Sequence, residues 1–291
     1  MFPGEIGFLQ TLEGIRNDFL NSVFEIITML GEEVIVVLIL SLIYFIFDKM
    51  LAKKIFFTII TSMNINGVVK NIARVSRPFA NGEVTPVKAD TATGYSFPSG
   101  HTQNFSTWST AFAIQFKKWW GFVIAGVLII LVGFSRMYLG VHYPSDVIFG
   151  ALFGIGTAIG MGFLFDKVKN KQLLYLITAG IFVPFFVYFL ISPNELYADF
   201  FKTYGMMLGL VFIEWFDNKF VNFDNKAPIW KKIIRFVVGV GLALAVKSIL
   251  KLTYESLTIL PIVLVLDSIR YFLLVAISFG LWPLIFKKIN L

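Results

Sequence analysis

Three polar clusters interrupt an otherwise apolar sequence. They are Lys70 with Arg77-Pro78; Pro98-Ser99-Gly100-His101; and Ser135-Arg136 with His142 and Asp146. The chain has two histidines, and both fall in these clusters. Two imidazoles, a carboxylate and several cations are the groups needed to bind an anion and to cleave it by nucleophilic and acid–base chemistry.

The cations of the clusters indicate a phosphate. Lys70, Arg77 and Arg136 stand near the ends of apolar segments, where an unpaired charge in hydrocarbon is costly. The adjoining loops contain few carboxylates, namely Glu83, Asp90 and Asp146. A phosphate matches the guanidinium forks and the ammonium group of this set, so we expect an anionic substrate with a phosphate.

The second cluster opens a helical segment. Free backbone N–H groups at Ser99, Gly100 and His101 would point toward the loop, and glycine allows an oxyanion to approach the backbone closely. Pro144 suits the first turn of a second helix, which repeats the arrangement. The sequence therefore predicts an anion site at these helix starts.

The spacing of His142 and Asp146 indicates a nucleophile with its orienting group. Asp146 lies four residues after His142, so in a helical turn the carboxylate can accept a hydrogen bond from one ring nitrogen. This bond leaves the other nitrogen with a free lone pair. His101 is then available to protonate a leaving oxygen, because an ordinary imidazole pKa is about 6.5.

Composition places these clusters in a membrane. Hydrophobic residues make up 57% of the 291 and charged residues 15%, against roughly 45–50% and 25% in soluble domains. The 33 Phe exclude a disordered chain, and the absence of cysteine excludes disulfides and thiolate metal sites. We predict an all-α, polytopic transmembrane helix bundle of about nine spans. The segments are near 34–50, 54–72, 102–116, 119–138, 145–165, 173–191, 200–214, 233–250 and 268–286.

Two further patterns concern the ends and faces of helices. Residues 5–31 mix charged and apolar residues at helical spacing, which predicts an N-terminal interfacial amphipathic helix. The first five residues lack the basic region of a secretory signal, so we expect no cleaved segment. Small residues spaced for close helix packing follow in the segment after Pro144. They are Gly150, Gly154, Gly156, Gly160 and Gly162.

The cations also indicate the orientation. Most of the 25 Lys and Arg fall in loops that alternate to one side, which the positive-inside rule makes cytoplasmic. The loops 73–101 and 136–145, which carry the polar clusters, then lie on the extracytoplasmic side. The net charge of +7 is explained by orientation and an anionic substrate, and it gives no support to nucleic-acid binding.

The ordered clusters resemble the three-part signature of the type-2 phosphatidic acid phosphatase superfamily. The match is Lys70-x6-Arg77-Pro78, Pro98-Ser99-Gly100-His101 and Ser135-Arg136-x5-His142-x3-Asp146, with no departure at any specified position. The resemblance covers about residues 25–190. Leu30-Gly31-Glu32-Glu33 with Asn66 is similar to the branch of sphingosine-phosphate and polyprenyl-diphosphate phosphatases.

The resemblance implies a metal-independent hydrolase of phosphate monoesters or diphosphates, without a cofactor. By the match, His142 forms a phosphohistidine, Asp146 orients His142, and His101 is the acid and later the base for water. The residues expected to hold the phosphoryl oxygens are Lys70, Arg77, Ser99, Gly100 and Arg136, with Pro78, Pro98 and Ser135 in support. The expected partner is a phosphorylated lipid at the outer leaflet of a bacterial-type cell membrane: polyprenyl diphosphate, phosphatidic acid, phosphatidylglycerophosphate or sphingoid phosphate.

The chain is expected to divide into an interfacial helix plus phosphatase core over 1–192 and a membrane extension of about three spans over 193–291. In the extension, Asp267 and Arg270 are expected to pair, with Lys247 and Lys251 extending toward the surface. The alternative to an enzyme is a phospholipid or polyprenyl-phosphate transporter, or flippase, that uses the cations for binding. The two histidines with Asp146 favour the enzyme, because binding alone needs neither a nucleophile nor an acid.

Overall fold

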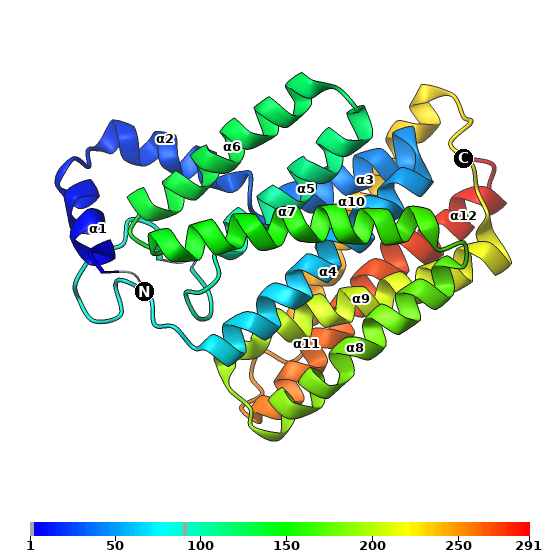
Figure 1. The fold of residues 1–291 in the computed structure, drawn as a ribbon. Helices are drawn as coiled ribbons and strands as arrows, with labels where there is room; N and C mark the ends of the chain where they lie inside the picture. The colour runs from blue at the N-terminus through cyan, green and yellow to red at the C-terminus, as the bar shows by residue number, and fades with distance from the viewer. Residues whose placement is uncertain (1–2, 90–91) are drawn as a thin grey trace. The chain divides into compact units, whose positions relative to one another are not determined.

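The computed structural model describes residues 3–89 and 92–291, and the regular structure within them is entirely helical (Figure 1). Asp90, one of the carboxylates expected beside the cations, lies outside the described residues. The chain forms two compact units. Unit 1 consists of Met1–Val36 with Ile65–Gly162, and unit 2 of Val37–Asn64 with Phe163–Leu291.

The helices follow the apolar segments of the sequence. Those that lie wholly or partly in unit 1 are α1 (Glu5–Gly14), α2 (Asp18–Met29), α3 (Glu33–Leu42), α4 (Lys49–Ala73), α5 (Gly100–Phe116), α6 (Trp119–Tyr138) and α7 (Pro144–Lys167). Unit 2 adds η1 (Ile43–Phe47), α8 (Lys171–Ile191), η3 (Glu195–Tyr197), α9 (Ala198–Phe216), η4 (Asp217–Val221), α10 (Ile229–Leu252), α11 (Leu260–Ala276), η5 (Ile277–Leu281) and α12 (Trp282–Lys288). The helices α3, α4 and α7 continue from one unit into the other.

Six helical segments of the described chain are long and apolar enough to cross a membrane, or seven if α2 and the segment Glu33–Phe47, bent by 46°, form one broken span. The sequence predicted about nine. The difference lies mainly in α4, which is long but carries lysines and asparagines along its length, and in α5, which has 17 residues. Large apolar side chains of the spanning helices are widely exposed, such as Ile130 at 71% and Ile181 at 60%, as lipid-facing side chains are.

The N-terminal region forms two helices instead of the single one expected over 5–31. The chain leaves α1 at Ile15, and Asn17 then caps α2 by accepting a hydrogen bond from the Leu20 N–H at 2.9 Å. An asparagine side chain favours this position because it satisfies an N–H that lacks a partner within the helix. An interfacial position for these helices remains a prediction.

Close packing of α7 on α5 involves two of the five glycines expected to pack. A Cβ at Gly150 would lie 2.8 Å from the Ser99 carbonyl oxygen, and one at Gly154 would lie 2.5 Å from the Gln103 carbonyl oxygen. At Gly156 and Gly160 a Cβ would meet no described atom within 4 Å. Gly150 and Gly154 are four residues apart and share one face of α7, whereas Gly156 and Gly160 lie on another.

In unit 2, α9 packs against α11 at glycine positions. A Cβ at Gly205 would lie 2.1 Å from the Ser268 carbonyl oxygen, and the Ser268 hydroxyl donates to the Phe201 carbonyl oxygen at 2.5 Å. Backbone atoms cannot move aside as a flexible side chain can. This glycine therefore permits the approach of the two helices.

We expect Gly205→Ala to destabilise the protein, because forcing a methyl group into a filled contact costs about 1–3 kcal/mol. The midpoint of thermal unfolding in detergent should fall by several degrees. Gly180→Ala in α8 is the matched control, since a Cβ there meets nothing within 4 Å. A midpoint for Gly205→Ala equal to or above that of Gly180→Ala would contradict the close approach.

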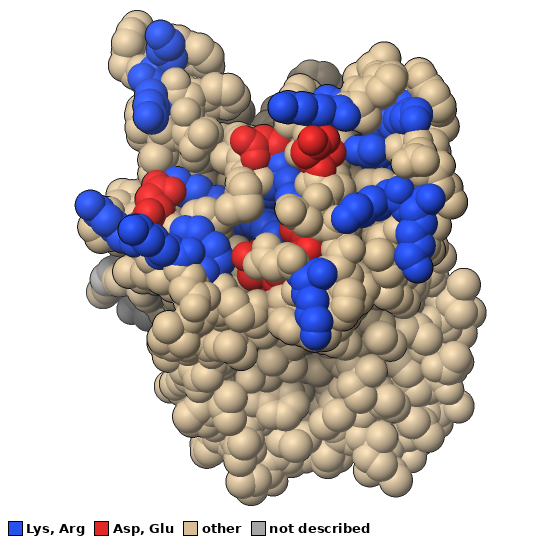
Figure 2. Space-filling model, turned by 90° about the vertical axis from the view of Figure 1, so that its right-hand side faces the viewer, with Lys and Arg blue, Asp and Glu red and all other residues tan. Residues whose placement is uncertain are grey.

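Buried ion pairs neutralise charges in unit 2. The Lys53 ammonium lies 2.8 Å from both Glu214 and Asp217, and all three side chains are buried. The predicted pair of Asp267 and Arg270 is confirmed at 2.8 Å. Figure 2 shows one face of the protein, on which Lys and Arg side chains gather together with several Asp and Glu side chains, above a broad surface without charged side chains.

Candidate active site

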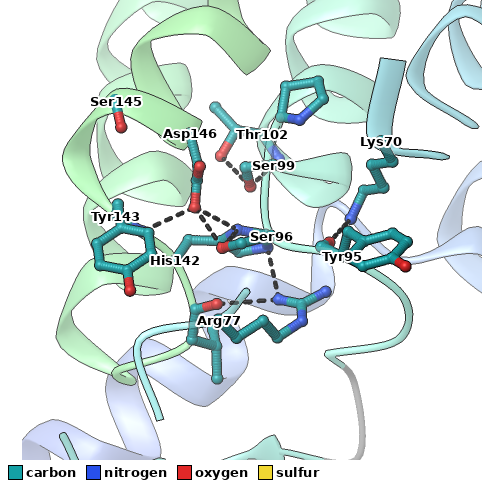
Figure 3. Close-up of polar contacts among 12 residues, drawn as sticks. Lys70, Arg77, Tyr95, Ser96, Ser99, Thr102, His142, Tyr143, Ser145 and Asp146 are labelled. Carbon is teal, nitrogen blue, oxygen red and sulfur yellow. Dashed lines mark hydrogen bonds and ion pairs between the residues drawn. The ribbon is translucent and has the colours of Figure 1, made fainter. Parts of the chain in front are cut away.

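The three polar clusters meet within unit 1. Lys70 lies in the last turn of α4, Ser99 caps the start of α5, and Arg136 lies in the last turn of α6. His142 occupies the connection between α6 and α7, and Asp146 the first turn of α7 (Figure 3). Helix ends thus supply most of the site, and the loop between α4 and α5 supplies Arg77.

His142 and Asp146 form the predicted contact. The His142 Nδ1 lies 3.2 Å from Asp146 Oδ2, and both side chains are almost fully buried. The same carboxylate oxygen accepts the Tyr143 N–H at 2.9 Å and the Ser96 hydroxyl at 2.5 Å. Because the carboxylate accepts a hydrogen bond from Nδ1, the proton of a neutral His142 belongs on Nδ1.

The other ring nitrogen of His142 faces Arg77. The Arg77 Nη1 lies 3.1 Å from His142 Nε2, and the same Nη1 donates to the Val141 carbonyl oxygen at 2.9 Å. The Arg77 Nε and Nη2 donate to the carbonyl oxygens of Gly94 at 3.0 Å and Thr93 at 2.5 Å. The loop backbone therefore holds the guanidinium at the nitrogen that carries the lone pair.

The remaining cations are also held in place. The Lys70 ammonium donates to the Tyr95 carbonyl oxygen at 2.7 Å, and Arg136 Nη1 donates to the Thr28 hydroxyl oxygen at 2.8 Å. The Arg136 side chain is wholly buried, at 0% exposure. At the start of α5, the buried Nε2 of His101 has no hydrogen-bond partner within the described part of the chain.

Burial and neighbouring cations keep both imidazoles neutral. The pKa of His142 is well below its usual value, first because of burial and then because of the charges of Arg77, Lys70 and Arg136. The pKa of His101 is lowered by burial and then by the same three cations, with Arg136 the strongest of them. The three positive charges disfavour a fourth on either imidazole.

The sequence predicted an anion site at the start of α7. In the structure, the Glu5 side chain of the protein itself lies at this position. The Glu5 carboxylate accepts the Ser145 N–H at 2.6 Å and the Ser145 hydroxyl at 3.2 Å. A carboxylate in this position satisfies a free N–H group and interacts favourably with the helix dipole. The Ser145 N–H is therefore bonded to Glu5 and not available to a phosphate.

The supporting motif residues have structural positions. Pro78 and Pro98 are buried, and the Ser135 hydroxyl donates to the Val132 carbonyl oxygen of its own helix at 2.7 Å. Asn66 donates to the Gln103 side chain at 2.8 Å and to the Pro98 carbonyl oxygen at 3.3 Å. Gly100 lies beside Asn66, whose Oδ1 would be 3.6 Å from an added Cβ.

Motif spacing did not reveal two residues that touch the site. Ser96 contacts both Asp146 and His142, the latter at 3.4 Å from Nδ1, and Thr28 contacts Arg136. A serine two residues before Pro98 is an ordinary loop residue in sequence. Thr28 lies 108 residues from Arg136 along the chain, so no local pattern connects them.

Within the described residues, no group of three or more His, Cys, Asp or Glu side chains is placed to hold a metal ion. The polar groups around His142 are instead the single carboxylate of Asp146, cations, hydroxyls and backbone groups. Such a set is suited to an anion that enters as part of a substrate.

Comparison with known proteins identifies the family. A family model described as the PAP2 superfamily matches residues 51–170, and one described as a PAP2 superfamily phosphatase, transmembrane extension, matches residues 201–291. Phosphatidylglycerophosphatase B of Bacillus subtilis is 33% identical over 159 residues, which are 48% of this chain and 73% of that protein. Undecaprenyl-diphosphatase of Sulfolobus acidocaldarius is 31% identical over 139 residues, 46% of this chain and 66% of that protein.

Other similarities cover shorter or less similar regions. Lipid A 1-phosphatase of Rhizobium johnstonii is 34% identical over 114 residues, which are 36% of this chain and 46% of that protein. The crystal structure of a PAP2-type phosphatidylglycerolphosphate phosphatase from Bacillus subtilis has 26% sequence identity and a TM-score of 0.48. It covers 57% of this chain and 87% of that one.

The apolar helices and the matched transmembrane extension define an integral multi-pass membrane protein of the phosphatase class. The chain belongs to the PAP2 superfamily, as its motifs predicted.

Proposed function

We propose that this protein is a lipid phosphate phosphatase that removes a terminal phosphate from a membrane lipid at the outer leaflet of a bacterial-type cell membrane. The observation that carries the proposal is His142 itself, with Nδ1 on Asp146 and Nε2 on Arg77. Its relatives are named as phosphatases of undecaprenyl diphosphate, phosphatidylglycerophosphate and lipid A, which supports this class of substrate.

In the first step, the lone pair of His142 Nε2 attacks the phosphorus, and an N–P bond forms while the P–O bond to the lipid breaks. His101 gives a proton to the departing lipid oxygen. The resulting phosphohistidine keeps the Nδ1 proton on the side of Asp146. Positive charge that develops on the imidazole is stabilised by the buried carboxylate.

In the second step, His101 removes a proton from a water molecule, and this water attacks the phosphorus. The N–P bond breaks, inorganic phosphate leaves, and the lone pair returns to His142 Nε2. Throughout both steps, Lys70, Arg77 and Arg136 stabilise charge on the phosphoryl oxygens, together with the backbone at Ser99 and Gly100.

The protonation states support these roles. A neutral His142 is the nucleophilic form, and burial with nearby cations lowers its pKa in that direction. His101 must instead carry a proton when the substrate is bound. A phosphate brings negative charge among the cations that lower the pKa of His101, so its binding raises that pKa and favours the acid form.

We further propose that residues 1–192 form the catalytic core with the N-terminal helices, and that 193–291 form a membrane extension. No metal or cofactor takes part in the proposed steps. The nucleophile, the acid and the charge stabilisation are all provided by side chains and backbone of unit 1.

The proposal is tested by measuring phosphate release from a lipid panel with the purified protein in detergent. The panel contains a polyprenyl diphosphate, phosphatidic acid, phosphatidylglycerophosphate and a sphingoid phosphate. We expect release from at least one lipid, with activity retained in EDTA. Saturable binding of these lipids without phosphate release would support a transporter, and strict dependence on a divalent ion would contradict the mechanism.

A further inference from the structure

The N-terminal segment, defined here as residues 5–36, precedes the region matched by the superfamily model but belongs to unit 1 with the site. The sequence alone predicted an interfacial helix for most of it. An anchor of that kind would have few buried polar contacts with catalytic groups. The segment instead makes hydrogen bonds to residues of the site and to the helix ends beside them.

Its first contact is with a phosphate-binding cation. Thr28, at the end of α2, accepts a hydrogen bond from Arg136 Nη1 at 2.8 Å, and both side chains have 0% exposure. A buried guanidinium needs acceptors for its N–H groups, and each bond fixes its direction. The Thr28 hydroxyl therefore restricts the position of the Arg136 fork.

Its second contact is with the proposed acid. A Cβ on Gly31 would lie 2.7 Å from the carbonyl oxygen and 2.9 Å from the Cβ of His101. The chain passes this point at the bend between α2 and α3, and Glu32 lies 3.8 Å from Lys88 just beyond it. The charge of Lys88 also lowers the pKa of His101, so the bend lies close to the residue proposed as the acid.

Its third set of contacts reaches the ends of the helices that frame His142. Glu5 caps the start of α7 at Ser145, the residue before Asp146. Arg16 donates from Nε to the Tyr138 carbonyl oxygen at 2.9 Å, two residues beyond Arg136. The segment therefore contacts Arg136 and His101 directly, and it contacts the helix ends on either side of His142.

We infer that the N-terminal segment is a component of the active site, in which Thr28 is a positioning residue that directs Arg136 toward the substrate phosphate. The inference rests on the proposed function. Thr28 does not touch the substrate itself. It acts through the guanidinium, whose direction decides how well the phosphoryl oxygens are held in the transition state.

The test compares substitutions at Thr28 in the full-length protein. Thr28→Val keeps the shape and removes the acceptor, so kcat/KM for phosphate release should fall about 10- to 100-fold, the range for a buried bond to a charged group. Thr28→Ser keeps the hydroxyl and should stay within about threefold of wild type. Thr253→Val, at an exposed position of unit 2 outside the N-terminal segment, is the matched control and should leave kcat/KM unchanged.

The pH profile separates positioning from general loosening. The acid limb of kcat/KM follows the pKa of His142, which the charge of Arg136 helps to lower. If Thr28→Val lets Arg136 turn away, that pKa rises toward its usual value and the acid limb moves to higher pH. Thr28→Ser should leave the limb in place.

Wild-type kcat/KM in Thr28→Val, or an equal loss in Thr28→Ser, would overturn the inference. So would a loss of activity with an unmoved acid limb. If Thr28→Val does not fold, Thr28→Cys provides the same comparison, because its thiol is a weak acceptor of similar size. Failure of the proposed function is recognised separately, because the wild-type protein would then release no phosphate from the lipid panel, or His142→Ala would release it at the wild-type rate.

Discussion

His142→Ala is expected to abolish phosphate release, lowering kcat by about ten-thousandfold or more, while the protein remains folded in detergent. The variant removes the atom to which the phosphorus would bond, and the proposed steps use the other imidazole, His101, as the acid. The guanidinium of Arg77, 3.1 Å from Nε2 in the wild-type protein, would still bind the phosphate. The KM should therefore change much less than kcat.

Two measurements complete this prediction. A phosphate-labelled substrate should give an acid-labile label on the wild-type protein that maps to His142 and is absent from His142→Ala. Ser135→Ala is the matched control, since Ser135 belongs to the same motif but its hydroxyl bonds to its own helix at Val132. Activity of His142→Ala within tenfold of Ser135→Ala would exclude histidine as the nucleophile.

Asp146→Asn is expected to have the second largest effect, lowering kcat by about a thousandfold to ten-thousandfold. An amide at this position can donate to His142 Nδ1, which moves the ring proton to Nε2 and removes the nucleophilic lone pair. The size of the side chain is unchanged, so packing is preserved. The kcat should fall while the thermal midpoint stays near that of the wild type.

Ser96 provides a graded comparison for Asp146. Ser96→Ala removes one of the donors to Asp146 Oδ2 but leaves the Tyr143 N–H and His142 in place. We expect a loss in kcat of about tenfold, as for one hydrogen bond to a charged group. If Asp146→Asn were no more damaging than Ser96→Ala, the carboxylate would not be setting the tautomer of His142.

The all-helical membrane class and the site motifs could be predicted because their signals are local. Apolar length predicts a span, and a separation of four residues brings His142 to Asp146 in one helical turn. The number of spans was harder to predict. In α4 and α5 polar residues occupy positions in the helix interior, and hydropathy alone does not tell a buried polar helix from a spanning one.

The same limit applies to the charges. Lys53 is an ordinary loop cation by its position in the sequence, yet its side chain is 2% exposed and bound between Glu214 and Asp217. Its partners lie more than 160 residues away. Ion pairs between residues so far apart depend on how the helices pack, and no periodic pattern in the sequence indicates them.

By itself, the sequence predicted the class of protein, the contact of His142 with Asp146, and the motif cations for which we propose a phosphate. These depend on residue type and on spacing within a helical turn or a short loop. Only the tertiary structure decided that Glu5 lies at the start of α7, that Ser96 donates a hydrogen bond to Asp146, and that Thr28 accepts one from Arg136. These contacts join segments 50 to 140 residues apart, and only the close packing of helices brings them within hydrogen-bond distance.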